Sequence, residues 1–234
     1  MDLSFIIPAY NEAERIGESL EKGIAYFAGE PYQWEIIVVD DGSADSTTDV
    51  VEGFADRGVR LLRQPQNMGK GAAVRRGMIE AEGEYRIFSD ADFSTPVEET
   101  AQMLEHLKQY DVAIGSRAID RSYVKVHQPW YREMMGNIFN LFVQVFAVSG
   151  IKDTQCGFKG FRSEVAESIF NRTKIDGFSF DVEALYIARK LGYSIKEFPV
   201  HWFNDERSTL NPVTDAIRMF RELLKIRSLH RGEF

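Results

Sequence analysis

Short apolar runs alternate with helical segments through the first half of the chain, and this alternation limits the fold more than any other feature. Continuous apolar strands joined by helices indicate a mainly parallel sheet that is covered on both faces. Such sheets bind ligands at the carboxyl ends of their strands. The expected strands are 3–8, 35–39, 59–62, 85–89 and 111–115, and the expected helices are 13–27, 71–82 and 96–110, with one more that starts at Ser43 or Asp45.

The regularity weakens in the second half, where larger helices follow one another. The expected helices are 131–149, 180–191 and 211–229, with a strand and turn over 153–162 and a strand over 195–203. The last helix is amphipathic, with apolar and basic residues on different faces. We see no linker, repeat or low-complexity stretch, so residues 1–234 are expected to form one α/β domain with C-terminal amphipathic helices.

Composition excludes several classes of protein. The 234 residues carry a formal net charge of −8, which argues against a nucleic-acid binder that works by neutralising phosphates. Cys156 is the single cysteine, so no intramolecular disulfide can form and a reducing compartment is expected. The start of the chain lacks the pattern of a signal peptide, and no apolar run has the length of a membrane span. The four histidines lie too far apart for a zinc site.

Polar and aromatic side chains follow the early strands at their carboxyl ends. Tyr10 follows the first strand and is placed to pack on a base, and Asp40 follows the second and can accept from a ribose hydroxyl or a base N–H. Asp90 and Asp92 follow the fourth strand, where two carboxylates so close together repel each other unless a cation lies between them. Oxygen ligands suit magnesium or manganese, so the pair predicts a divalent metal ion that bridges a diphosphate.

Each of these motifs also has a simpler structural explanation. The segment 40–43 is, by itself, more often a strand-to-helix turn, and a lone Asp-x-Asp is more often solvated surface. Gly69-Lys70-Gly71 resembles a phosphate loop but lacks the Ser or Thr that follows the lysine in a P-loop. No G-x-G-x-x-G follows the first strand, which disfavours a dinucleotide-dependent dehydrogenase. Cys156 is expected to be a buried small apolar residue.

Taken together and in order, the motifs are far more specific. FIIPAYNE, IIVVDDGSADST, NMGKGAAVRRG, FSDADFSTP and AIGSR resemble the inverting GT-A glycosyltransferases of family 2. The later DTQCGFKGFR, GFSFDVEALYIARKLGY and VHWF resemble the branch of that family that transfers sugars to dolichyl and other polyprenyl phosphates. The resemblance spans residues 3–227. It implies a GT-A fold, meaning a mainly parallel Rossmann-like sheet flanked by helices, and hexose transfer from a nucleotide sugar with Mg²⁺ or Mn²⁺ as cofactor. Transfer to a sugar hydroxyl or another lipid, and a non-catalytic nucleotide-sugar-binding module, remain as alternatives.

The resemblance assigns roles to individual residues of the donor site. It makes Asp90 and Asp92 the metal site, with Asp92 as the metal ligand. Mannose synthases of this branch carry Gln at the position of Ser94, so the resemblance favours glucose from UDP-glucose, with mannose from GDP-mannose as the alternative. The residues implied to contact the nucleotide sugar are Pro8, Tyr10, Glu12, Asp40, Lys70, Asp90, Ala91, Asp92 and Arg207.

The acceptor site is implied by a second group of residues. Arg117 and Arg132 resemble the arginines that hold the acceptor phosphate, and a guanidinium matches a phosphate in geometry and charge. Asp153 resembles the acidic residue near the anomeric carbon, and with Asp92 these three form the implied catalytic set. Residues 1–117 are therefore expected to bind the nucleotide sugar, and residues 118–234 the acceptor.

Two helices are candidates for contact with a membrane. Residues 131–149 are rich in large apolar side chains, and residues 211–229 carry apolar side chains between basic ones. A basic amphipathic helix is typical of a membrane-surface element. The alternative is that both helices pack on the sheet. We expect peripheral attachment to the cytoplasmic face of a membrane, where the protein meets its polyprenyl phosphate.

Overall fold

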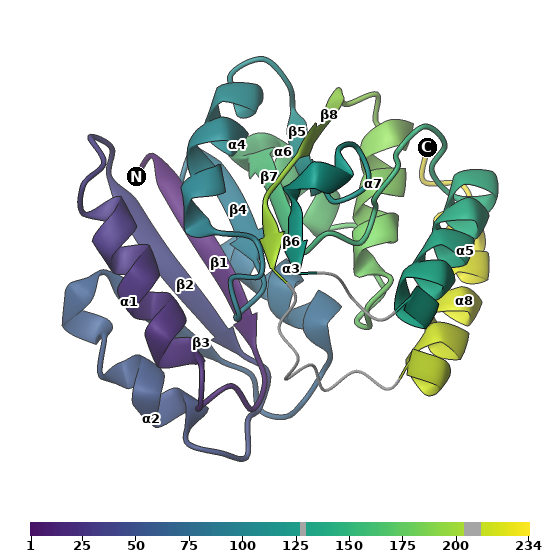
Figure 1. The fold of residues 1–234 in the computed structure, drawn as a ribbon. Coiled ribbons are helices and arrows are strands. Elements are labelled where there is room, and N and C mark those ends of the chain that lie inside the picture. The colour runs from purple at the N-terminus through teal and green to yellow at the C-terminus, as the bar shows by residue number, and fades with distance from the viewer. Residues whose placement is uncertain (127–129, 204–211) are drawn as a thin grey trace.

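The computed structural model describes residues 1–126, 130–203 and 212–234. Its main sheet has the strand order β3-β2-β1-β4-β7-β5-β8 (Figure 1). All neighbouring strands are parallel except β7, which runs antiparallel to both β4 and β5. The strands are β1 Leu3–Ala9, β2 Trp34–Asp40, β3 Val59–Arg63, β4 Tyr85–Ser89, β5 Val112–Ser116, β7 Phe158–Arg162 and β8 Ile195–Pro199, and a small second sheet pairs β6 Val124–Val126 with β9 Trp202–Phe203.

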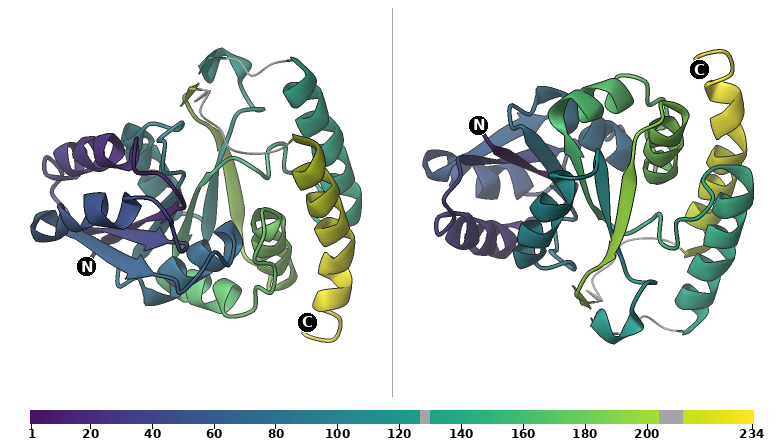
Figure 2. Two further views of the ribbon diagram at one scale, coloured as in Figure 1. Left: turned by 90° about the horizontal axis from the view of Figure 1, so that it is seen from below. Right: turned by 90° about the horizontal axis from the view of Figure 1, so that it is seen from above.

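Helices cover both faces of the main sheet (Figure 2). One face carries α1 Ile16–Phe27, α2 Thr47–Glu52 and α4 Thr100–Leu107, and the other carries α3 Lys70–Glu80, α6 Ser163–Phe170 and α7 Phe180–Lys190. Short 3₁₀ turns, namely η1 Ala55–Arg57, η2 Val97–Glu99 and η3 Arg121–Tyr123, connect some of these elements. The predicted α/β fold, with a mainly parallel sheet between two helical layers, is confirmed.

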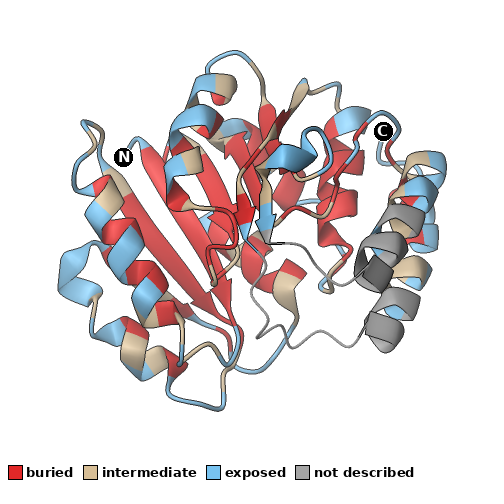
Figure 3. Cartoon of the chain, in the orientation of Figure 1, coloured by how far each residue is buried: buried red, intermediate tan, exposed pale blue. Residues whose placement is uncertain are grey.

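Alternating side chains along the strands build a core on each face. Phe5 and Ile7 of β1 belong to the cluster on the α1 side, whereas Ile6 between them belongs to the cluster on the α3 side. All seven residues of β1 and all five of β5 are buried. β2, β4 and β7 are buried except for one partly exposed residue at an end of each strand (Figure 3). Burial on both faces explains why these strands are continuous apolar runs.

The two halves of the chain share this sheet. β7 comes from the second half but lies between β4 and β5 from the first half. Because β7 runs antiparallel to β4, Phe158 at the start of β7 pairs with Ser89 at the end of β4. The start of β7 therefore lies at the same edge of the sheet as the motifs that follow β4 and β5.

The remaining two helices form a separate pair. α5 Trp130–Phe146 and α8 Pro212–Leu229 lie side by side, and α8 also contacts α7 (Figures 1 and 2). Phe142 and Phe220 meet edge to face, with ring centroids 5.0 Å apart. Leu223 and Ile226 of α8 are buried in the core cluster. Among the described residues, no helix is long and apolar enough to cross a lipid bilayer.

Several predicted boundaries are wrong. The helix expected over residues 13–27 begins at Ile16, the helix expected over 96–110 is divided into η2 and α4 and ends at Leu107, and the helix expected over 131–149 ends at Phe146. The helix expected to start at Ser43 or Asp45 begins at Thr47, after Ser46. The hydroxyl of Ser43 instead accepts from the Asn11 amide, and the Asp45 carboxylate accepts from the Thr47 amide in a turn. The strand expected over residues 195–203 is divided between β8 and β9, which belong to different sheets.

Candidate active site

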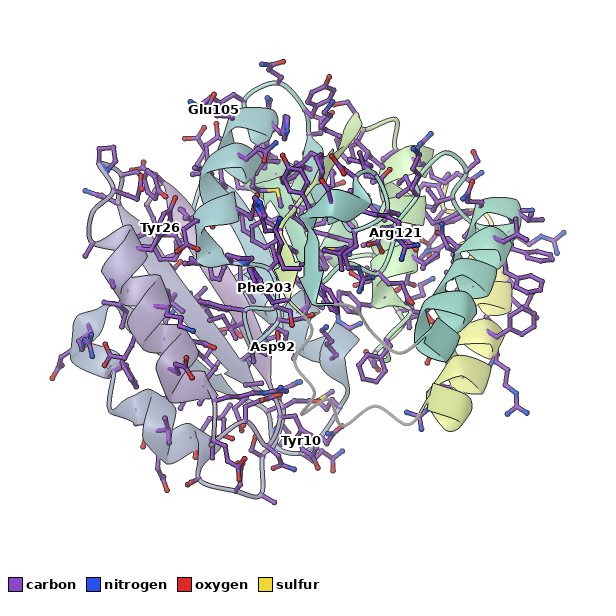
Figure 4. The ribbon with its side chains drawn as sticks, in the orientation of Figure 1. Tyr10, Tyr26, Asp92, Glu105, Arg121 and Phe203 are labelled. Carbon is purple, nitrogen blue, oxygen red and sulfur yellow. The ribbon has the colours of Figure 1, made fainter. Side chains whose placement is uncertain are left out.

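The carboxyl ends of β1, β2 and β4 meet at one edge of the sheet. The register pairs Ala9 with Asp40 at the end of β1 and β2, and β4 lies on the other side of β1. Pro8 is in β1, and Tyr10 directly after it is 45% exposed. Tyr10 and Asp92 both lie at this edge in Figure 4. Parallel pairing thus brings together the side chains that the sequence places at the strand ends.

The loop after β1 is hydrogen-bonded to the loop after β2. Asn11 has a left-handed backbone (φ 55°), and its side-chain oxygen accepts from the Ala44 amide at 2.9 Å. The Glu12 amide donates to the Thr47 hydroxyl at 2.8 Å. The Glu12 carboxylate pairs with Arg15, whose Nη2 is 2.7 Å from Oε1. Glu12, which the resemblance implies to contact the nucleotide, is therefore already paired with the Arg15 guanidinium. This guanidinium lies between Glu12 and the Asp-x-Asp turn.

The two aspartates that end β2 have different partners. Asp40 is buried and accepts from the Ser43 amide at 3.2 Å. Asp41 accepts from the Gln64 side chain and from the Met68 and Gly69 amides at 2.7 to 2.8 Å. Burial raises the pKa of Asp41, although these three hydrogen bonds oppose the shift. Asp41 therefore ties down the loop that leads into Lys70.

Gly42 lets this loop come close. Its backbone is left-handed (φ 71°), and a Cβ atom there would lie 2.4 Å from the carbonyl carbon of Gln66. Only glycine fits both conditions without a shift of the backbone.

Asp90 and Asp92 lie in a tight, strained turn after β4. Phe93 has φ 46°, which a bulky residue seldom adopts, and its buried ring packs edge-on against Phe5. The Asp92 carboxylate accepts from the Ser94 amide at 2.9 Å, and the Ala91 carbonyl accepts from the Ser19 hydroxyl at 2.6 Å. Backbone strain held in place by packing is typical of functional sites.

Burial raises the pKa of Asp92, and the neighbouring charge of Asp90 raises it further. Arg15 Nη1 lies 3.8 Å from Asp92 Oδ2 and opposes this shift. On the other side of the turn, Lys70 Nζ lies 2.5 Å from Asp90 Oδ1. The two carboxylates are thus flanked by cations of the protein, one at each end.

Gly157 allows the second half of the chain to approach Asp90. A Cβ atom at this position would lie 2.0 to 2.4 Å from the Asp90 carboxylate atoms. The Gly157 carbonyl also accepts from the Asp90 amide at 3.1 Å. The segment before β7 therefore supports the Asp-x-Asp turn directly.

A buried ion pair lies behind this turn. Lys159 of β7 is 0% exposed, and its Nζ donates to Asp181 Oδ1 at 2.8 Å and to the Cys156 carbonyl at 2.5 Å. Burial raises the pKa of Asp181, and Lys159 and Lys70 oppose this shift. Cys156 itself is fully buried, as predicted, and burial raises its pKa to about 11.

Arg117 and Asp153 form a two-hydrogen-bond pair after β5. Arg117 Nε and Nη2 lie 2.7 and 2.9 Å from the two carboxylate oxygens. Burial disfavours the Asp153 anion, but Arg117 outweighs it and lowers the pKa of Asp153 to about 2. The guanidinium also lies over the Trp202 ring, 5.4 Å from its centroid. Two residues with separately predicted roles thus form one rigid unit.

The acceptor side is described only in part. The backbone of Arg132 lies in the first turn of α5, and its side chain lies outside the described part. Arg207 also falls outside the described residues. The structure therefore brings together the predicted set Pro8, Tyr10, Glu12, Asp40, Lys70, Asp90, Ala91, Asp92, Arg117 and Asp153 at one edge of the sheet.

Sequence analysis missed three charged residues of the site, namely Arg15, Lys159 and Asp181. Lys159 carried a usable signal, because a lysine inside an apolar strand needs a buried partner. Asp181 carried no such signal, because an acidic residue in the first turn of a helix is common. Arg15 has no distinguishing signal, because its role depends on the fold of the loops around it.

The donor set fits a divalent metal ion with few protein ligands. Within residues 1–126, 130–203 and 212–234, no cluster of three or more His, Cys, Asp or Glu is placed to hold a metal. Mg²⁺ commonly binds through one or two carboxylates together with substrate phosphates and waters. Asp90 and Asp92 supply such a pair, one residue apart directly after β4.

An acidic turn and an arginine–aspartate pair thus lie at one edge of the sheet, and comparison with known proteins gives the family. The family model of glycosyl transferase family 2 matches residues 4–170. The chain belongs to this family.

Relatives in several eukaryotes match nearly the whole chain. The dolichyl-phosphate beta-glucosyltransferase of Dictyostelium discoideum is 37% identical over 241 residues, which cover 96% of this chain and 73% of the relative. The enzyme of the same name in Homo sapiens is 34% identical over 241 residues, covering 96% and 74%. The one in Saccharomyces cerevisiae is 33% identical over 247 residues, with the same coverage.

Solved structures confirm the GT-A fold. The glucosyl-3-phosphoglycerate synthase of Mycobacterium tuberculosis, solved with Mn²⁺, UDP-glucose and phosphoglyceric acid, matches with a TM-score of 0.72 at 16% identity, over 97% of this chain and 79% of that one. The same enzyme with Mg²⁺ and UDP also has a TM-score of 0.72, at 17% identity and the same coverage.

Proposed function

We propose that this family 2 glycosyltransferase moves glucose from UDP-glucose to the phosphate of a dolichyl or other polyprenyl phosphate, with inversion at the anomeric carbon. The observation that carries the proposal is that Asp90–Asp92 and Arg117–Asp153 lie at the same edge of one sheet. The chain that carries them matches dolichyl-phosphate beta-glucosyltransferases over 96% of its own length.

The donor site is proposed on residues 1–117 together with Arg207 of the second half. Tyr10 packs on the base, Asp40 and Glu12 face the base and ribose, and Pro8 and Ala91 line the site. Lys70 and Arg207 contact the diphosphate. Asp90 and Asp92 hold Mg²⁺ or Mn²⁺, which when bound neutralises charge on the departing diphosphate. From the second half, Gly157, Lys159 and Asp181 support this site through the contacts described above.

The acceptor itself supplies the nucleophile. A phosphate monoester has its second pKa near about 6, so it is largely dianionic at neutral pH. One of its oxygens forms the bond to the anomeric carbon while the bond from that carbon to the UDP oxygen breaks, and UDP leaves with the electron pair. Arg117 and Arg132 hold the phosphate in line, which is the main task of the protein in such a displacement. Asp153 fixes the Arg117 guanidinium and orients it.

The test is a transfer assay with labelled UDP-glucose and GDP-mannose, in Mn²⁺, with a short polyprenyl phosphate. We expect lipid-linked glucose from UDP-glucose and none when the corresponding polyprenol replaces the phosphate, because the alcohol lacks the anionic nucleophile. Calorimetric titration should show UDP binding about tenfold or more tighter than GDP. Tighter GDP binding would reverse the donor assignment, and glucose transfer to a sugar hydroxyl but not to the lipid phosphate would refute the acceptor.

We also propose that α5 and α8 attach the protein to the cytoplasmic face of a membrane. The outer side of this pair exposes large apolar residues, among which Leu141 is 62% and Val145 61% exposed. The neighbouring helix α8 exposes the basic residues Arg218, Arg221, Lys225 and Arg227, and Arg227 Nη2 lies 3.4 Å from the Val145 carbonyl oxygen. Exposed apolar and basic side chains on one helix pair match a bilayer with anionic head groups. The single buried cysteine suits the reducing cytoplasm.

Replacing Leu141 and Val145 by serine should weaken binding to vesicles that contain phosphatidylserine by about tenfold or more, because two apolar side chains no longer enter the interface. Sedimentation with sucrose-loaded vesicles measures this. Ile79→Ser is the matched control, since Ile79 is 40% exposed on α3. Equal loss in both variants, or binding that does not weaken with added salt, would contradict membrane attachment through this surface.

A further inference from the structure

Lys70 occupies an unusual place at the start of α3. Its backbone is fixed from both sides, because the Gly69 amide donates to Asp41 at 2.8 Å and the Gly71 amide donates to the Asp176 carbonyl at 2.8 Å. Its side chain reaches Asp90, with Nζ 2.5 Å from Oδ1, and is about one quarter exposed. A change in this contact therefore has to come from the side chain rotating and not from the helix moving.

Lys70 is a cation at neutral pH, because the ordinary pKa of lysine is about 10.4, and its ion-pair partner is Asp90. A divalent metal ion that binds Asp90 and Asp92 would meet this ammonium at the same carboxylate. The metal ion and the Lys70 ammonium repel each other when both lie at the Asp90 carboxylate, so binding of the metal ion favours movement of the lysine away from it.

Asp181 lies behind the turn, where it is buried and paired with Lys159. Its charge also acts on Lys70. Lys159 is immobilised by the Cys156 carbonyl at 2.5 Å and by the Phe88 ring, whose centroid is 5.4 Å from Nζ. Lys159 is thus fully enclosed, whereas the Lys70 side chain is about one quarter exposed.

We infer that Lys70 serves as an internal cation that holds Asp90 until the divalent metal ion binds, and that it then turns toward Asp181 and the donor diphosphate. Asp181 is then a positioning residue that attracts Lys70 after the metal ion has bound. Its ion pair with Lys159 keeps Asp181 itself in place. The inference rests on the proposed metal site but not on the identity of the sugar or of the acceptor.

The exchange predicts opposite effects of one substitution on two ligands. Lys70→Met should bind Mn²⁺, in the absence of nucleotide, about ten- to a hundredfold more tightly than the wild type, because the competing charged hydrogen bond is gone. With Mn²⁺ saturating, the same variant should bind UDP about ten- to a hundredfold more weakly, because the cation no longer reaches the diphosphate. Calorimetric titration of the full chain measures both constants.

Two further variants separate charge from packing. Lys70→Arg keeps the charge and can pair with a carboxylate through two hydrogen bonds, so it should bind Mn²⁺ no more tightly than the wild type. Lys108→Met removes an exposed lysine paired with Glu105 and should change neither constant. Lys70→Arg also keeps the test decisive if Lys70→Met does not fold.

Mn²⁺ binding by Lys70→Met that is equal to or weaker than that of the wild type would overturn the inference, and so would tighter binding by Lys70→Arg. Either result leaves the proposed transfer reaction in place. Failure of every variant to bind Mn²⁺ would instead refute the metal site, and with it both the inference and the proposed role of Asp90 and Asp92.

Discussion

Replacing Asp92 by asparagine should lower the rate of sugar transfer by about a thousandfold or more, while the folded protein becomes more stable. The rate falls because the carboxylate that we propose as the metal ligand is lost, and a bound metal contributes several kcal/mol to stabilising a departing diphosphate. Stability rises because burial and the neighbouring Asp90 raise the pKa of Asp92, so that its anion costs free energy at neutral pH. Initial rates and thermal unfolding without metal measure the two effects.

This prediction is specific because the transfer rate should fall while the stability of the folded protein rises. Asp111→Asn is a matched control, because Asp111 precedes β5 at the opposite end of the sheet and accepts from Ser194. It should leave the transfer rate unchanged. Transfer by Asp92→Asn at a rate near that of the wild type in the presence of EDTA would show that the reaction does not use a metal at this position.

The second large effect is expected at Arg117. Arg117→Ala should lower kcat/KM for the polyprenyl phosphate by about ten- to a hundredfold, since a hydrogen bond to a charged group is worth roughly 1.5–3 kcal/mol. The affinity for UDP should change little. Arg132→Ala should show the same selective loss, and Arg132→Lys should recover only part of it, because an ammonium lacks the planar fork. Kinetic titrations that vary lipid phosphate and sugar nucleotide separately distinguish the two substrates.

Arg57→Ala is the control for Arg117. Arg57 makes a similar two-bond pair with Glu21, at 2.6 and 2.7 Å, but on the exposed surface. It should affect neither substrate. If Arg117→Ala and Arg132→Ala impair only the nucleotide titration, both arginines belong to the donor site.

The pH dependence of stability gives an independent measurement on the Arg117 pair. The folded pKa of Asp153 is about 2, below its ordinary value of 3.8. The pair therefore stabilises the fold above about pH 4, and this contribution disappears as the pH falls toward about 2. The free energies of unfolding of the wild type and of Arg117→Ala should converge over this range. A constant difference between them would mean that Asp153 is not the partner that matters.

Much of the fold follows from local sequence pattern. The run 85–89 predicts β4 to the residue, and the runs 35–39 and 59–62 predict β2 and β3 to within one residue at each end. Strands buried on both faces must be continuously apolar, so the pattern is unambiguous. The start of α2 was missed because Ser43 and Asp45, both good capping residues, are engaged in contacts between loops.

The site, like the fold, could be predicted from the sequence only where it depends on local pattern. Residues at the ends of parallel strands meet at one edge whatever the rest of the fold, and so Tyr10, Asp40 and Asp90 were predictable as neighbours. The pairing of Arg117 with Asp153 was not predictable, because the two residues are 36 positions apart and meet only after β7 has entered the sheet. For the same reason the Lys159–Asp181 pair was not recognised.

The sequence by itself determined the alternation of strands and helices, the parallel pairing of the early strands and the set of acidic and basic groups at their carboxyl ends. These depend on short-range periodicity and on the geometry common to all parallel sheets. Only the tertiary structure decided which charges neutralise one another. The insertion of β7 between β4 and β5 places Gly157 against Asp90 and Lys159 beside Asp181. Ion pairs of this kind depend on distance in space, which separation along the chain does not encode.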